Sequence, residues 1–364
     1  MISDHNLSPI DSLEVVADFR RSPSLWAADL LLPLRLIVGW TYFSAFWRRM
    51  VIDYKLDPDV AGYVGDKFNH FLPNALLIGP VIEFFVTHPE LLWWKLFAFT
   101  IVEALVGFAL MAGWMTRLMG VATSGLAMGI LLGAGWPGTT CLDEWQVGLL
   151  GVGSGIALVF AGGGRFSADA WMHQRWGASG RAVTGWARSL EAPLWLRQPV
   201  LLGTVGLACL GLTLWTNQVF HGGVWGTLHN KSVRPVVELS EATLRDGALN
   251  VQLYRVEGAD VYGSFAIGLA LRDGKGKTVV QWTAEDLAGT AEGDIHNHYV
   301  AKVRPGKYSL VLPLGARADV HLRHEALGNL APGKYQVVLI DISGVSWHTE
   351  VTVAAWGIEG VVGW

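Results

Sequence analysis

The sequence is poor in cysteine and in charged side chains. It has two cysteines among 364 residues, which predicts neither a disulfide framework nor a metal-binding cysteine cluster. Only 16% of the residues are charged and the net charge is −4, so nothing indicates nucleic-acid binding. No dinucleotide fingerprint, phosphate-binding loop or haem-attachment motif occurs. Redox chemistry would therefore have to use a diffusible organic cofactor or a thiol, and no metal, flavin or haem is expected.

Hydrophobic residues, in contrast, are abundant. They make up 51% of the chain, which also has 18 Trp and 44 Gly, a composition typical of a membrane protein. Apolar stretches close to the roughly 20 residues that span a bilayer core occur at 30–47, 91–114, 118–136, 146–163 and 200–220. The sequence predicts an α-helical membrane protein, with a four-helix bundle plus one anchor helix, embedded in a lipid bilayer.

The region after Phe220 has a different pattern. Short runs rich in β-forming residues alternate with turn dipeptides such as Asp273-Gly274 and Pro305-Gly306. The predicted strands are 250–256, 264–272, 277–282, 307–313, 319–323, 334–342 and 347–353. They predict an all-β, immunoglobulin-like sandwich domain. His296 and His298 would share one strand face, but no third close ligand supports a metal site.

Charge between the apolar stretches predicts the orientation. Residues 164–199 hold five arginines against two acids, which the positive-inside rule places in the cytoplasm. The N-terminal 25 residues have no continuous apolar core and include four acids, so no cleavable signal peptide is expected. We expect an inner-membrane protein with a cytoplasmic N-terminus and a periplasmic C-terminal domain. The predicted parts are a cytoplasmic segment 1–25, a membrane domain 26–175, an Arg-rich cytoplasmic linker 176–198, an anchor helix 199–221 and an exported domain 222–364.

Residues 73–89 leave two readings open. The segment is apolar but short and contains Glu83, which favours a helix that lies on the membrane or dips into it. A membrane-spanning helix would invert the topology from that point onward.

Two charged residues fall inside apolar stretches. Arg35 lies about 9 Å into the first stretch and Glu103 near the middle of the second, at about 1.5 Å per helical residue. A buried charge in hydrocarbon costs at least about 2.5 kcal/mol, so such residues usually face a partner or a substrate path. An Arg35–Glu103 ion pair that holds the bundle together is one interpretation. A catalytic pair that also handles protons or orients a quinone is the other, and both can hold together.

Arg48, Arg49 and Lys55 lie at the predicted outer end of the first helix, against the positive-inside rule. They either snorkel to lipid headgroups or form a cationic mouth that recruits a small anion. In the second interpretation Arg48, Arg49 and the adjacent Trp47 bind substrate.

Cys141 and two aromatic residues complete the candidate site. Cys141 lies in a predicted outer loop beside Asp143 and Glu144, and it is the one plausible nucleophile, although a lone loop cysteine is more often inert. Trp40 and Phe43 lie on the helix that carries Arg35. They either belong to the interfacial aromatic belt or line a slot for a flat quinone ring.

Segments 34–46 (LRLIVGWTYFSAF) and 103–117 (EALVGFALMAGWMTR) resemble the DoxX/DoxD family of four-helix membrane proteins. The anchor that follows, with NQVFHGGVWG at 217–226, and the β domain are similar to DoxA. Together the parts resemble the two subunits of thiosulfate:quinone oxidoreductase, here fused. The resemblance implies that thiosulfate is oxidised to tetrathionate and that electrons pass to a membrane quinone.

Two other functions remain open on the sequence. One is a non-catalytic membrane scaffold whose exported β domain binds a partner, and the other is a related sulfur or thiol oxidoreductase with another substrate. The sequence does not fix the oligomeric state, and a homo-oligomer is one arrangement that it allows.

Overall fold

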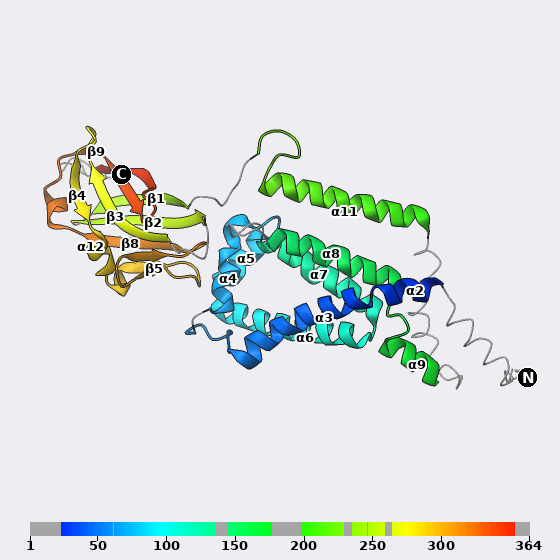
Figure 1. The fold of residues 1–364 in the computed structure, drawn as a ribbon. Helices are drawn as coiled ribbons and strands as arrows, with labels where there is room; N and C mark the ends of the chain where they lie inside the picture. Colours follow the sequence, from blue (N-terminus) through cyan, green and yellow to red (C-terminus); the bar gives the residue numbers. More distant parts are fainter. Residues whose placement is uncertain are drawn as a thin grey trace, which may run out of the picture. The chain divides into compact units, whose positions relative to one another are not determined.

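The computed structural model describes residues 23–60, 62–134, 144–176, 198–228, 235–245, 247–258 and 264–353. A helical N-terminal region is followed by a β-sandwich, so the predicted fold class is confirmed (Figure 1). Contacts divide these residues into two compact units. The helical unit comprises the described parts of 23–60, 94–131 and 144–227, and the second unit comprises those of 62–93, 132–134 and 228–353.

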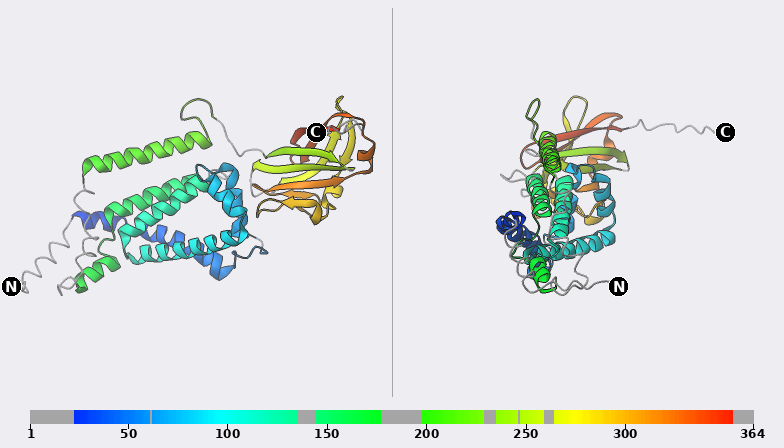
Figure 2. Two further views of the ribbon diagram at one scale, coloured as in Figure 1. Left: turned by 180° about the vertical axis from the view of Figure 1, so that it is seen from behind. Right: turned by 90° about the vertical axis from the view of Figure 1, so that its right-hand side faces the viewer.

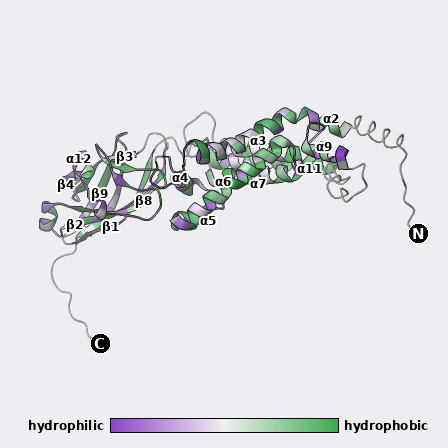
Figure 3. Cartoon of the chain, turned by 90° about the horizontal axis from the view of Figure 1, so that it is seen from below, coloured by the Kyte–Doolittle hydropathy of each residue, from purple (hydrophilic) through white to green (hydrophobic). Residues whose placement is uncertain are grey.

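The helical unit is built from long apolar helices that run alongside one another (Figures 1 and 2). Their hydrophobic composition is visible along α3, α6, α7 and α11 (Figure 3). The helices are α2 (Pro23–Leu30), α3 (Leu32–Trp47), the π-helix η1 (Arg48–Ile52), α6 (Pro89–Ala112), α7 (Thr116–Ala134), α8 (Glu144–Ala161), α9 (Ala168–Trp176) and α11 (Pro199–Phe220).

Each of the five predicted apolar stretches contains a helix. By length and hydropathy, α6, α7 and α11 qualify as membrane spans within the described residues, while the apolar part of α8 is shorter. The 16 residues of α3 are extended by the five residues of η1. Most of the apolar surface of α11 is open, but its end contacts α8, where the rings of Trp145 and Phe220 lie 6.2 Å apart.

Small residues let the bundle helices approach closely, as in other membrane helix pairs. A Cβ atom added to Gly107 of α6 would lie 2.5 Å from the carbonyl oxygen of Gly39 and from the amide nitrogen of Phe43, both in α3. A Cβ atom on Gly155 of α8 would lie 2.6 Å from the carbonyl oxygen of Gly120 in α7. These contacts require glycine, because any side chain would push the two backbones apart.

Residues 62–88 contain only short helices: α4 (Val64–His70), the 3₁₀ helix η2 (Leu72–Asn74) and α5 (Gly79–Val86). The eight residues of α5 extend about 12 Å, which is too short to cross a bilayer. Residues 73–89 therefore form no single helix long enough to span a bilayer, which favours the reading of a helix that lies on the membrane. This segment packs on the β domain within the second unit.

The β domain consists of two antiparallel sheets. One has the strand order β1-β2-β8-β5, and the other has the order β10-β9-β3-β7-β6, with β4 also paired to β3. The strands are β1 (Val236–Arg245), β2 (Ala248–Glu257), β3 (Ser264–Arg272), β4 (Thr278–Trp282), β5 (Ile295–Asn297), β6 (Arg304–Pro305), β7 (Leu310–Leu312), β8 (Arg317–Arg323), β9 (Gly333–Asp341) and β10 (Ser346–Val353). All seven predicted strands are present in some form, and β1, β5 and β6 are additions to them.

The space between the sheets is filled by alternate side chains of facing strands. Leu249, Val251 and Leu253 of β2 are buried against residues such as Leu269 and Leu271 of β3. Because side chains alternate across a strand, this spacing sends every second residue into one core.

Candidate functional site

Glu103 forms an ion pair with Arg49. The carboxylate Oε2 of Glu103 accepts a hydrogen bond from Nη1 of Arg49, which also lies 3.4 Å from the hydroxyl of Thr100. The Glu103 side chain is only 5% exposed and that of Arg49 is 23% exposed. A deeply buried carboxylate on an apolar helix therefore has a cationic partner that is partly exposed at the surface of the helical unit.

The elements around this pair explain its position. Arg49 belongs to η1, where the chain leaves regular α-helical geometry directly after α3. Such π-helical turns often occur at functional sites. Thr100 lies three residues before Glu103 and thus on the same face of α6. Gly107 lies one turn beyond Glu103, and its close contact with Phe43 brings α3 against this face.

The predicted ion pair between Arg35 and Glu103 is wrong. Arg35 is 2% exposed, and its two terminal nitrogens donate to the carbonyl oxygens of Gly163 and Phe166, the latter at 2.6 Å. These carbonyls belong to the loop between α8 and α9. Because a guanidinium offers several fixed donors, one side chain fastens a whole turn of backbone at the end of the bundle.

Other charged residues at the Arg35 end also satisfy helix termini. Asp169 accepts hydrogen bonds from the backbone N–H groups of Met115 and Thr116 at 2.8 and 3.0 Å, so it caps the start of α7. Arg117 donates to the carbonyls of Val159 and Phe160 at the end of α8. The cluster around Arg35 thus has a structural role.

Arg48 differs from Arg49 in its surroundings. Its Nε donates to the carbonyl of Ser44 at 3.3 Å, and the residue is exposed. Lys55, the third cation predicted at this place, forms a 3.5 Å ion pair with Asp53. An exposed guanidinium therefore stands beside the buried Arg49–Glu103 pair.

The predicted aromatic residues share one face of α3. The ring of Phe43 lies 6.0 Å from that of Trp40 and 6.3 Å from that of Trp47, with which it is stacked. Trp40 is 56% exposed and Trp47 is 43% exposed, so the two indoles border the surface of the helical unit. The face is aromatic, and Phe43 anchors it at the crossing with Gly107.

Cys141 lies outside the residues that the structure describes, so its role stays a prediction. In the described part of the chain, Cys209 of α11 has a free thiol.

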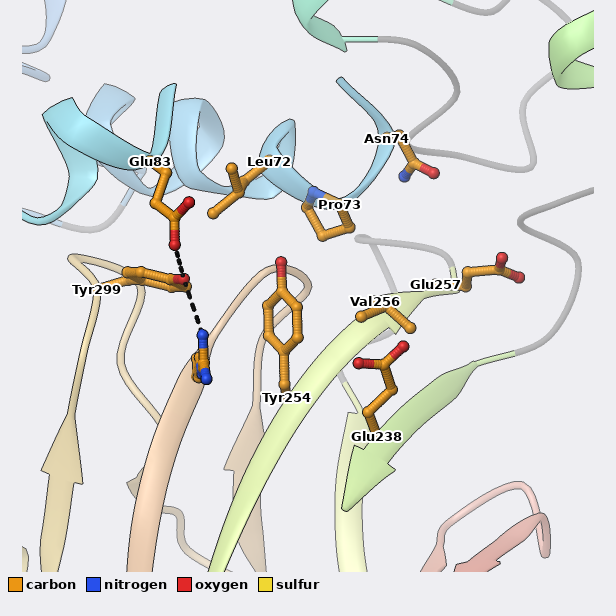
Figure 4. A pocket seen from close by; sticks show the side chains of 10 residues that line it. Leu72, Pro73, Asn74, Glu83, Glu238, Tyr254, Val256, Glu257 and Tyr299 are labelled. Carbon is orange, nitrogen blue, oxygen red and sulfur yellow. Dashed lines mark hydrogen bonds between the residues drawn. The ribbon is translucent and has the colours of Figure 1, made fainter. Parts of the chain in front are cut away.

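The second unit contains a cavity of about 450 Å³ between residues 62–93 and the β1-β2-β8-β5 sheet (Figure 4). Tyr299 donates from its hydroxyl to Glu83 Oε1 at 2.8 Å, and Arg317 Nη1 lies 3.5 Å from the same hydroxyl. The cavity is lined by Leu72, Pro73, Asn74, Glu83, Glu238, Tyr254, Val256, Glu257, Tyr299 and Arg317. Nothing in the local sequence pattern marks it.

The electrostatics of this cavity disfavour a dianion. Three glutamates face one arginine, so the formal charge of the lining is negative. Burial raises the pKa of Tyr254, and the charges of Tyr299 and Glu238 raise it further. The hydrogen bond to Tyr299 raises the pKa of Arg317. The arginine stays charged and the tyrosines stay neutral at ordinary pH, so an anion would meet a lining of net negative charge.

Apolar spanning helices, a buried ion pair and a two-sheet domain define a helical membrane protein joined to a β-sandwich. Residues 30–195 match the family described as the TQO small subunit DoxD, and residues 220–350 match the TQO small subunit DoxA. TQO denotes thiosulfate:quinone oxidoreductase. The chain is a fused DoxD/DoxA protein of the thiosulfate:quinone oxidoreductase-like type, which confirms the resemblance seen in the sequence.

Proposed function

We propose that the protein oxidises thiosulfate and passes the electrons to a membrane quinone at the Arg49–Glu103 pair. Two thiosulfate dianions lose two electrons and form the central S–S bond of tetrathionate. The quinone takes up these two electrons and two protons and becomes a quinol. The family matches support this class of reaction, and the buried ion pair is the observation that carries the assignment of a site.

Arg49 suits the anion because its guanidinium already holds an oxyanion. Carboxylates and oxoanions such as thiosulfate use the same planar fork of N–H donors. The exposed Arg48 provides the first attraction for a dianion, and Arg49 receives it closer to Glu103. An incoming anion competes with the Glu103 carboxylate for Arg49.

Glu103 suits proton delivery because the competition for Arg49 can leave its carboxylate without a partner. When Arg49 turns to the substrate, the buried carboxylate loses its partner and is best stabilised by taking up a proton. The protonated carboxyl can then donate this proton to a quinone oxygen, as a general acid does. The face formed by Trp40, Phe43 and Trp47 offers the flat ring a stacking surface near this position.

The orientation completes the proposal. The arginine-rich residues 164–199 favour the cytoplasm, which sets the end of α3 that carries Arg48 and Arg49 at the outer face. Thiosulfate then arrives from the periplasm. Cys141, predicted on the same side, is the candidate nucleophile. Its thiolate and a first thiosulfate would lose two electrons and form a mixed Cys–S–S–SO₃⁻ adduct. A second thiosulfate would then attack this adduct, release tetrathionate and return the cysteine thiolate.

Steady-state kinetics with thiosulfate and a soluble quinone analogue separate the roles of the two arginines and the glutamate. Glu103→Gln should lower kcat by about 100-fold or more, because general acid catalysis contributes at least that factor. Arg48→Gln should raise the KM for thiosulfate and leave kcat near the wild-type value. The assignment is wrong if Glu103→Gln turns over normally.

A further inference from the structure

The β1-β2-β8-β5 sheet carries a row of polar side chains on the face opposite its core. Gln252 of β2 pairs with Asp319 of β8, and Asp319 pairs in turn with His296 of the edge strand β5. Residues that pair directly across antiparallel strands point to the same face of a sheet. Val251, next to Gln252 in β2, points into the core, so the row lies on the outer face. His298, two residues after His296, also belongs to this face.

The imidazole of His298 is held by a carboxylate. Its Nε2 lies 2.9 Å from Oδ2 of Asp319. The other carboxylate oxygen, Oδ1, accepts a hydrogen bond from Nε2 of Gln252 at 2.9 Å, and Oε1 of Gln252 accepts one from Nε of Arg317 at 2.8 Å. Both oxygens of the carboxylate therefore have partners. Because the neutral imidazole donates its Nε2–H to Asp319, its lone pair is on Nδ1.

A second imidazole lies beside this lone pair. The ring centres of His296 and His298 are 5.2 Å apart, and the rings are almost perpendicular, at 81°. His296 is exposed, and the His298 side chain is 32% exposed. Within the part of the chain that the structure describes, neither Nδ1 of His298 nor the His296 ring has a hydrogen-bond partner. Two imidazoles with available nitrogens thus meet at the edge of the sheet.

The separation of the two rings is the one that a shared metal ion requires. A zinc–nitrogen bond is about 2.0–2.1 Å long and a ring nitrogen lies about 1.15 Å from the ring centre, so two imidazoles on one tetrahedral ion have centres about 5.2 Å apart. Two imidazoles at right angles on a square-planar ion would have centres about 4.5 Å apart. The observed 5.2 Å has the tetrahedral value, so the pair can accept zinc with little rearrangement.

The geometry points to a zinc site formed by His296 and His298 on the outer face of the sandwich, with Asp319 as the positioning residue. A histidine that ligates a metal usually donates its other ring N–H to a carboxylate, which is the contact that His298 makes. Among the described residues no third histidine, cysteine or carboxylate completes a ligand cluster, so water fills the other positions. Such positions are open to exchange with an external ligand.

The sequence alone did not favour a metal here, because Asp319 lies 21 residues after His298 and only the pairing of β8 with β5 brings them together. The site is separate from the Arg49–Glu103 pair. It does not depend on the reaction proposed above.

Calorimetric titration of the full-length protein with ZnCl₂ tests the site. The protein is purified in detergent without a polyhistidine tag and is treated with a chelator before dialysis. One Zn²⁺ should bind per chain with a saturable isotherm. His296→Gln and His298→Gln remove one ligand each, so each should raise the Kd by about 10-fold or more. An unchanged Kd in His296→Gln would overturn the proposal.

His321→Gln is the matched control on the same face. Nδ1 of His321 lies 2.6 Å from Oδ1 of Asn250, and its Nε2 accepts a hydrogen bond from Nε of Arg323 at 3.3 Å, so both of its nitrogens are occupied. Zinc binding by this variant should match the wild type. An equal loss of affinity in His321→Gln and His296→Gln would show non-specific binding to surface histidines and contradict the assignment.

Asp319→Asn tests the carboxylate without removing a ligand. Loss of a partner that orients a ligating histidine typically weakens metal binding by about 10- to 100-fold, so the Kd should rise by that factor while the stoichiometry stays at one. Wild-type affinity in this variant would contradict the role of Asp319. Titration with Co²⁺ reports the geometry, because tetrahedral Co²⁺ absorbs visible light much more strongly than the hydrated ion. Binding without this absorption would contradict a tetrahedral site.

Discussion

Replacement of Arg49 by glutamine isolates the energy of the buried ion pair. Loss of one partner of a buried pair costs about 3–5 kcal/mol, because the other charge stays uncompensated. Arg49 is 23% exposed, so the pair is less buried than the pairs for which this range was measured, and the lower part of the range applies. The Glu103 carboxyl can also take up a proton, and the cost of doing so is an upper limit to the loss. At pH 7, about 2.7 pH units above the ordinary glutamate pKa of about 4.3, this cost is about 3.7 kcal/mol, at about 1.36 kcal/mol for each pH unit. We expect Arg49→Gln to destabilise the fold by about 2–3.5 kcal/mol.

Denaturant titration of the detergent-solubilised protein, followed by tryptophan fluorescence, measures this change. Arg48→Gln is the matched control, because Arg48 is exposed and donates only to its own helix; its effect should stay within about 0.5 kcal/mol. Adding Glu103→Gln to Arg49→Gln should recover at least half of the loss, since no charge is then buried. The loss of stability in Arg49→Gln should also shrink as the pH falls toward about 4.3, the ordinary glutamate pKa, because protonation of Glu103 then costs little free energy.

Two results would refute this reasoning. Equal destabilisation by Arg49→Gln and Arg48→Gln would show that the pair has no special energy. Failure of the double variant to recover would show that Arg49 acts through packing alone, since the coupling energy between the two positions would then be near zero.

Four further predictions follow from other parts of the molecule. Cys141→Ser should abolish turnover in the quinone assay if the thiol carries a sulfur adduct, and normal turnover would remove it from the mechanism. Gly107→Ala should destabilise the bundle by about 1–3 kcal/mol in denaturant titration, because its Cβ would lie 2.5 Å from backbone atoms of α3. Asp169→Ala should cost about 1–2 kcal/mol in the same titration through loss of the α7 cap. Burial, together with the hydrogen bond to Glu83, raises the pKa of Tyr299. The contribution of Tyr299 to the stability of the β domain should therefore be complete below about pH 10 and be lost as the pH rises through the higher folded pKa, which denaturant titration across this pH range measures.

The sequence predicted where charge is buried but not how it is paired. Arg35 and Glu103 were at compatible depths, and depth alone favoured a bond between them. The real partner of Arg35 is the backbone of 163–166, a contact across 128 and more residues that no local pattern records. Thr100 could have been found, because a hydroxyl three residues before a buried carboxylate on a helix shares its face.

The β domain shows the same limit. Strands with a marked apolar run, such as β9, were predicted nearly to the residue. Strand β1 was missed because it is an edge strand with mostly exposed side chains and a register shift between Ser240 and Thr243. The packing of α4 and α5 on the sandwich also left no signal, since Asn69 of α4 and Glu83 of α5 are ordinary polar residues until the fold places them.

The stoichiometry of the reaction decides the proposed function and is measured on the purified protein with thiosulfate and a soluble quinone analogue. We expect one tetrathionate and one quinol for every two thiosulfates consumed, with both products dependent on Glu103. Folded protein that forms no quinol from thiosulfate across a range of pH values, or forms it equally well as Glu103→Gln, would contradict it.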